Sequence, residues 1–83
     1  LLDALIVGAT IEDLDISDID EFESRTDKED ILNVYSKLKC GSRNHIRNYT
    51  NQIEDNGDSY APQFLSEEEL TEILSASNER CGW

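Results

Sequence analysis

Three side chains of this sequence are suited to binding one metal ion: Glu12, Asp15 and His45. The two carboxylates lie one helical turn apart, and His45 is the only histidine. Carboxylates and imidazoles that point into a helical bundle are typical ligands of iron, manganese or zinc. A buried histidine also needs a partner for each ring nitrogen, so a structural His–carboxylate cluster without metal is the alternative.

One feature weakens the metal interpretation. Di-iron bundles usually carry a Glu-x-x-His motif on one helix. Here the residue three positions before His45 is Ser42, and the pair of acids lies in a different segment. The sequence therefore predicts Glu12, His45 and Asp15 as metal ligands. It assigns no catalytic residue and leaves open whether the protein is an enzyme.

Residues 26–57 are predicted to form one long helix that carries the histidine. Apolar positions recur there in steps of three and four, which places them on one stripe. Thr26 and Glu29 form a T-x-x-E capping box, so the helix should begin at Asp27, and Gly57 should provide its left-handed C-terminal cap. The stripe consists of Ile31, Val34, Leu38, Ser42, His45, Tyr49 and, at its end, Gln52 or Ile53.

Residues 1–24 are predicted to form a helix with two acids at the centre of its apolar stripe. Gly8 within it favours close packing of another helix. The stripe consists of Leu1, Leu5, Gly8, Glu12, Asp15, Ile19 and Phe22. The remaining acids are expected on the solvent side, and these are Asp13, Asp18, Asp20 and Glu21.

The connection between the two helices is short, which predicts an antiparallel hairpin. Glu12 and His45 lie at similar distances from this turn, within roughly one helical turn in height. We therefore expect Glu12, Asp15 and His45 to approach one another in the dry interior of the hairpin.

The chain changes character after Gly57. Tyr60, Phe64 and Leu65 are expected to fold back against the hairpin. A second capping box, Ser66 with Glu69, predicts a short helix over 67–76. The remaining residues to 83 form a polar tail. The predicted fold class is all-α, with a helical hairpin over 1–57 and a loop, short helix and tail over 58–83.

Composition narrows the function classes. The chain has 83 residues and a formal charge of −12. Such an excess of acid disfavours nucleic acid and anionic membranes as partners, since both would repel it. No apolar run is long enough to span a bilayer, so we expect a soluble protein. The chain lacks an initiator methionine, so we expect it to be a fragment of a longer protein. The sequence does not distinguish between the prokaryotic cytoplasm and the cell exterior as its compartment.

The two cysteines are too few for a disulfide framework. Cys40 lies on the opposite side of the long helix from His45, at about 140° by the helical period. We predict that Cys40 is a solvent-side thiol and Cys81 a residue of the tail, and that the two do not pair.

Three segments resemble a known family: VGATIEDLDISDID, TDKEDILNVYSKLKCGSRNHIRNY and NGDSYAPQFLSEEEL. They are similar to the C-terminal half of an uncharacterised ferritin-like family, which is catalogued as a domain of unknown function. The resemblance implies that residues 1–24 and 27–56 match the third and fourth helices of a four-helix bundle. It also implies that Glu12 and His45 match ligands of a carboxylate-bridged metal pair, with iron, manganese or zinc as the expected cofactor.

The resemblance leaves the first helical pair of the bundle without a counterpart in this chain. A two-helix hairpin of this length has an apolar stripe with nothing to cover it. We therefore predict a homo-oligomer, most simply a dimer, or pairing with the missing N-terminal half of the same protein. In a two-fold dimer, each set of Glu12, Asp15 and His45 would meet its copy near the axis.

Overall fold

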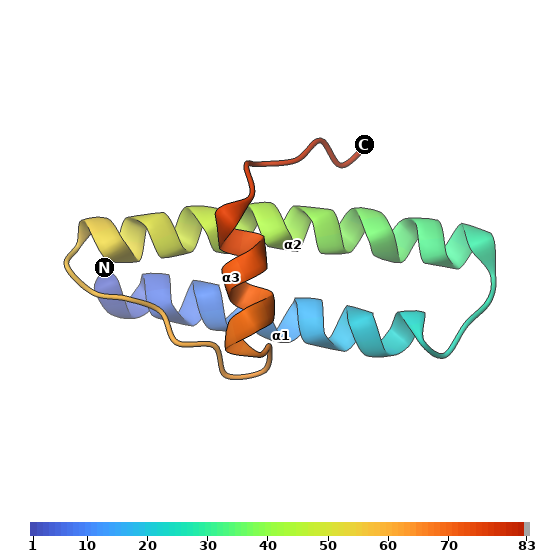
Figure 1. Ribbon diagram of the computed structural model, residues 1–83, viewed down its shortest axis with the longest axis horizontal. Helices are drawn as coiled ribbons and strands as arrows, with labels where there is room; N and C mark the ends of the chain where they lie inside the picture. Colours follow the sequence, from blue (N-terminus) through green and yellow to red (C-terminus); the bar gives the residue numbers. More distant parts are fainter. Residues whose placement is uncertain (83) are drawn as a thin grey trace.

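The structure is a computed structural model that describes residues 1–82. It contains three α-helices and, over these residues, no strand: α1 (Leu2–Glu23), α2 (Glu29–Asp55) and α3 (Glu67–Ser75). Helices α1 and α2 form an antiparallel hairpin, and α3 crosses it at a steep angle (Figure 1). The all-α prediction is confirmed. The helices of the described part are all too short or too polar to cross a membrane.

The ends of the helices follow local sequence signals in part. Gly57 follows α2 with a φ of 84°, and the Asp58 N–H donates to the Ile53 carbonyl oxygen, which is the predicted left-handed ending. The Ser66 hydroxyl accepts a hydrogen bond from the Glu69 N–H at 3.1 Å, as the second capping box requires. Helix α3 ends one residue before the predicted position.

The first capping box does not form. Helix α2 begins at Glu29, two residues later than predicted, and Lys28 occupies the N-cap position without a side-chain cap. The Thr26 hydroxyl instead accepts a hydrogen bond from the Lys28 N–H at 3.3 Å. Thr26 is thus part of the turn between the helices, where a hydroxyl competes locally with helix formation.

The core lies where α1, α2, the loop after α2 and α3 meet. Its buried side chains come from all four segments and are Leu5, Ala9, Ile16, Ile46, Ile53, Leu65 and Leu70. Gly8 lies beside the Tyr49 ring of α2, and a Cβ atom there would approach that ring to 2.6 Å. The predicted close approach at Gly8 is therefore present.

The apolar stripe predicted for α1 is rotated from the face that is buried. The buried residues of α1 are Leu5, Ala9, Asp13 and Ile16. At about 100° per residue, this face lies roughly a quarter of a turn from the predicted stripe centred on Glu12 and Asp15. The expectation that Glu12, Asp15 and His45 meet in a dry hairpin interior is therefore wrong. Asp15 and His45 are exposed, and Glu12 lies at one edge of the buried face.

Asp13 is fully buried, although the sequence predicted it to be solvated. Its Oδ2 atom accepts hydrogen bonds from the Tyr60 hydroxyl and the Gln63 N–H, both at 2.7 Å. Its Oδ1 atom accepts one from the Leu65 N–H at 2.8 Å. Burial and the hydrogen bond to Asp13 raise the pKa of Tyr60 to about 12. Asp13 thereby holds the loop in the position from which α3 starts.

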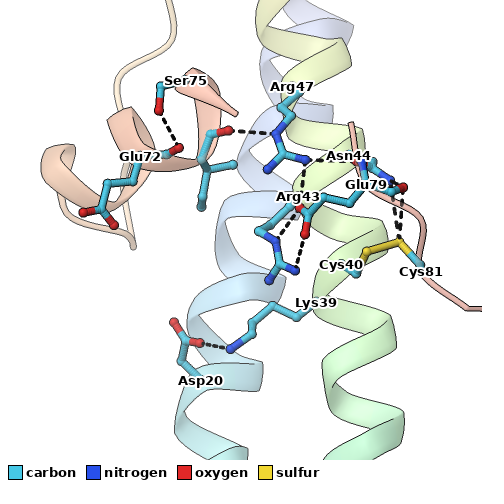
Figure 2. A network of polar contacts seen from close by, with 11 residues as sticks. Asp20, Lys39, Cys40, Arg43, Asn44, Arg47, Glu72, Ser75, Glu79 and Cys81 are labelled. Atoms are coloured by element: carbon cyan, nitrogen blue, oxygen red, sulfur yellow. Dashed lines mark hydrogen bonds and ion pairs between the residues drawn. A yellow bond between two sulfur atoms is a disulfide. The ribbon is translucent and has the colours of Figure 1, made fainter. Parts of the chain in front are cut away.

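The C-terminal segment returns along α2, and a disulfide joins Cys40 to Cys81 (Figure 2). The prediction of two unpaired cysteines is therefore wrong. Cys40 does lie away from His45, but the tail covers that side of α2 and leaves Cys40 buried. The predicted tail over 77–83 is described to Gly82, and Trp83 lies outside the described residues.

Glu79 fixes the same segment to α2 by ion pairs. Arg43 donates to both Glu79 carboxylate oxygens at 2.8 Å, and Arg47 Nη1 lies 2.9 Å from Glu79 Oε2. Hydrogen bonds from Arg43, with a contribution from Arg47, lower the pKa of Glu79 to about 2. Arg47 also donates to the Ile73 carbonyl oxygen at 2.7 Å, so a buried guanidinium connects α3, the tail and α2.

Candidate functional site

The structure brings Glu12 and His45 together across the hairpin. His45 Nδ1 of α2 lies 3.2 Å from Glu12 Oε2 of α1, within reach of a hydrogen bond from a protonated Nδ1. The antiparallel hairpin with its short turn (Figure 1) allows Glu12 of α1 to reach His45 of α2. The Glu12 side chain is 13% exposed and the His45 side chain 62% exposed.

The pair lies in a groove between α1 and α2. Two adjoining cavities of about 540 and 400 Å³ share Glu12 and His45 in their walls. His45 and Arg47 are two residues apart on α2, and thus about 200° apart around the helix. Since Arg47 faces α3, the groove opens on the side of the hairpin that α3 leaves uncovered. The larger cavity is lined by Glu12, Asp15, Lys37, Leu38, Gly41, Ser42, Asn44, His45 and Cys81.

Asp15 lines the larger cavity but adds no third ligand to the pair. Over residues 1–82, no group of three histidine, cysteine, aspartate or glutamate side chains is close enough to hold a metal ion. Asp15 is exposed on α1, one turn beyond Glu12. The structure thus joins two of the three predicted residues, and it does so in an open groove. Metal binding by these residues stays a prediction.

The geometry of the pair suits two kinds of chemistry. An uncharged or protonated imidazole with its Nδ1–H directed at a carboxylate is an ordinary hydrogen-bonded pair. Two ligands with metal bonds of about 2.1 Å also lie roughly 3.0 to 3.4 Å apart in octahedral or tetrahedral coordination. The observed 3.2 Å between nitrogen and oxygen fits either arrangement.

Apolar side chains continue the groove toward the turn of the hairpin. Val34 and Leu38 of α2 are both about half exposed. They precede His45 at helical spacing and therefore share its side of α2. An open groove that combines a His–carboxylate pair with exposed apolar residues resembles a contact surface for further helices.

Sequence reasoning missed Cys81 as a residue of the groove wall. Its position depends on the disulfide to Cys40, 41 residues away, which has no local signal in the sequence. It also missed Asn44, whose side chain donates to the Glu79 carbonyl oxygen and accepts from the Glu79 N–H, both at 2.8 Å. These contacts bring the tail to the edge of the groove.

Over residues 1–82 the chain is an all-helical domain with a His–carboxylate pair in an open groove. Residues 1–77 match the family described as an uncharacterized protein domain, DUF2202, and the chain belongs to this family.

The chain is similar to the uncharacterized protein MJ0754 of Methanocaldococcus jannaschii, with 52% identity over 79 residues. This match covers 95% of the chain and 43% of that protein. The crystal structure of hypothetical protein MJ0754 matches with a TM-score of 0.92 and 51% identity, over 94% of this chain and 45% of that one. The chain thus spans less than half the length of this relative. These names specify neither a ferritin-like fold nor a metal, so that part of the resemblance stays a prediction.

Proposed function

We propose that this chain is half of a ferritin-like helical bundle and supplies Glu12 and His45 as ligands for a divalent metal ion. The observation that carries the proposal is the 3.2 Å approach of Glu12 Oε2 and His45 Nδ1 from two facing helices. Iron, manganese or zinc would suit this pair, and Asp15 is a third candidate ligand from the same groove. The metal, when bound, would supply Lewis-acid or redox chemistry.

The proposed metal site would be completed by ligands from outside the described helices. Glu12 and His45 are two ligands, whereas metal sites in helical bundles take carboxylates and histidines from several facing helices. The His45 ring is mostly exposed, so its second nitrogen and the space beside it are accessible to an incoming side chain. A second helical hairpin laid over the groove would bring further ligands to the pair.

For this chain on its own, the second hairpin would come from a second copy, and the alternative is a further segment of the same polypeptide. Val34 and Leu38 would then be buried together with the site. Sedimentation equilibrium at about 50 µM should give a dimer for the wild type. Leu38→Glu should give a monomer, because it places a charge in the contact. Phe64→Glu, at a similarly exposed loop position, is the control and should stay dimeric. A monomeric wild type would contradict the pairing by a second copy.

Metal binding is tested by titrating metal-free protein with cobalt(II) and following its visible absorption, with metal analysis of protein purified without chelator. Glu12→Gln and His45→Gln should each lower the affinity at least tenfold, because each removes a ligand. Asp18→Asn removes one negative charge from α1 outside the cavity walls and should leave the affinity unchanged. Equal affinity in all four proteins would rule out this site.

The alternative function is a helical assembly module in which Glu12 and His45 fix the register of the helices. The observation that favours it is the lack of a three-ligand group over residues 1–82. This function predicts that purified protein retains no metal and that its thermal midpoint does not change with EDTA. It further predicts that His45→Gln alters self-association without any metal present.

A further inference from the structure

Helix α1 has a second apolar surface on the side away from the core. Val7, Ile11 and Leu14 are 58%, 54% and 37% exposed. They follow one another in steps of four and three, so they form one stripe along the helix. At about 100° per residue this stripe lies roughly opposite the buried residues Leu5 and Ile16. We call it the outer stripe of α1.

The outer stripe is distinct from the groove. The walls of the groove contain Glu12 and Asp15 of α1 but none of the residues of the outer stripe. A hairpin laid over the groove would therefore approach α1 from a different side. A surface helix is normally apolar on one side only, and a helix that is apolar on several sides is normally buried on several sides. The outer stripe is therefore a candidate surface for an occupant of its own.

Charge defines the chemistry of that occupant. Two carboxylates lie beside the outer stripe: Asp3 is on one flank, and Asp18 continues the stripe at the next helical position. Between Leu2 and Glu23 the sequence contains acids but no lysine or arginine. A second copy of α1 placed here would bring carboxylates against carboxylates, in a chain whose formal charge is already −12.

We propose that the outer stripe of α1 binds an amphipathic helix of another polypeptide that carries lysine or arginine beside its apolar positions. Apolar side chains of the partner would pack on Val7, Ile11 and Leu14 at the spacing of a helix-on-helix contact. Its basic side chains would then face Asp3 and Asp18. The apolar contact supplies most of the affinity, and the carboxylates select basic partners and exclude acidic ones.

The test uses the full chain and a fluorescently labelled synthetic helix of about three heptads, with leucine at the apolar positions and lysine beside them. Fluorescence anisotropy should show binding in the micromolar range that weakens as sodium chloride is raised, since the flanking charges are screened. The same peptide with glutamate in place of lysine should not bind. No binding of the lysine peptide, or equal binding of the glutamate peptide, would overturn the proposal.

Matched variants locate the contact. Val7→Ser/Ile11→Ser should weaken binding of the lysine peptide at least tenfold without changing the net charge. Leu1→Ser/Phe64→Ser removes two exposed apolar residues that lie outside both the outer stripe and the groove walls, and it should leave the binding unchanged. Circular dichroism confirms that both double variants fold. An equal loss in both would show non-specific attraction to an acidic protein and refute the assignment to α1. Self-association that is lost only in Val7→Ser/Ile11→Ser would identify a second copy as the occupant and would equally refute it.

Discussion

Asp13→Asn tests whether one buried carboxylate holds the loop after α2 in place. The native carboxylate accepts hydrogen bonds from the Tyr60 hydroxyl and the Gln63 and Leu65 N–H groups, all at 2.8 Å or less. Asparagine has nearly the same shape but offers one acceptor oxygen and directs an NH₂ group at the remaining donors. Whichever way the amide is turned, at least one native hydrogen bond is lost and two donors face each other.

The magnitude follows from burial. A hydrogen bond to a charged group contributes about 1.5–3 kcal/mol, and a buried donor without a partner costs about 1–3 kcal/mol. Because the loop lies at the surface, water can reach part of the freed backbone. We therefore expect Asp13→Asn to lower the free energy of unfolding by about 2–4 kcal/mol. A domain of this size has a total stability on the order of 4–12 kcal/mol, so the variant should fold but with a clear loss.

The assay is urea unfolding followed by far-ultraviolet circular dichroism, with the disulfide kept oxidised. Asp15→Asn is the matched control: it makes the same chemical change two residues away at an exposed position, and should shift stability by no more than about 0.5 kcal/mol. Native-state hydrogen exchange should show faster exchange of the Gln63 and Leu65 amides in Asp13→Asn. A loss below about 1 kcal/mol, with both amides still protected, would refute the role given to Asp13.

Three further predictions concern the tail and the helix contact. The double variant Cys40→Ser/Cys81→Ser should lose about 4 kcal/mol in urea unfolding, because the closed loop spans 41 residues; a loss near zero would contradict this estimate. Glu79 has a folded pKa of about 2 against an ordinary value of 4.5, so its contribution is present above pH 4.5 and is lost as the pH falls toward 2. With its partial exposure taken into account, that contribution is about 1–2 kcal/mol, and Glu79→Gln should flatten the acid limb of a stability–pH curve. Gly8→Ala should destabilise the protein by about 1 kcal/mol, because the clash with the Tyr49 ring outweighs the gain in helix propensity; Gly8→Ala/Tyr49→Val should recover the loss, and a stabilising Gly8→Ala would contradict the observed packing.

The helices were predictable where the local signals were strong and independent. Periodic apolar positions identified α1 and α2, and the cap residues Ser66 and Gly57 marked the ends that the structure shows. The capping box at Thr26 and Glu29 failed because the same hydroxyl serves the turn. A short sequence motif cannot distinguish a cap from a turn when both use the same acceptor.

The orientation of α1 was not predictable from periodicity alone, because its apolar residues surround most of the helix. Two stripes with the same spacing competed, one through Glu12 and one through Ala9 and Ile16. The buried part of the second stripe contains a single acid, Asp13, which is the residue that the loop surrounds. That isolated acid among apolar positions was the available signal. The sequence alone does not mark Asp13 as buried, because acids are rarely fully buried without a partner, and its partners are a tyrosine hydroxyl and backbone N–H groups about fifty residues away.

The candidate site was predictable in its pairing but not in its surroundings. Antiparallel helices and a short turn were sufficient to place Glu12 beside His45. Burial depends on which other segments cover the hairpin. The tail covers α2 at Cys40 because a disulfide and the ion pairs of Glu79 hold it there, and these long-range contacts have no periodic signature.

The disulfide also divides the molecule into two mechanically unequal parts. From Cys40 to Cys81 the backbone closes into a covalent ring that contains the second half of α2, the loop and α3. Helix α1 lies outside this ring, and within residues 1–82 its covalent connection to the ring runs through the turn and the first part of α2. The packing and hydrogen bonds of α1, and no sulfur link, therefore keep Glu12 beside His45.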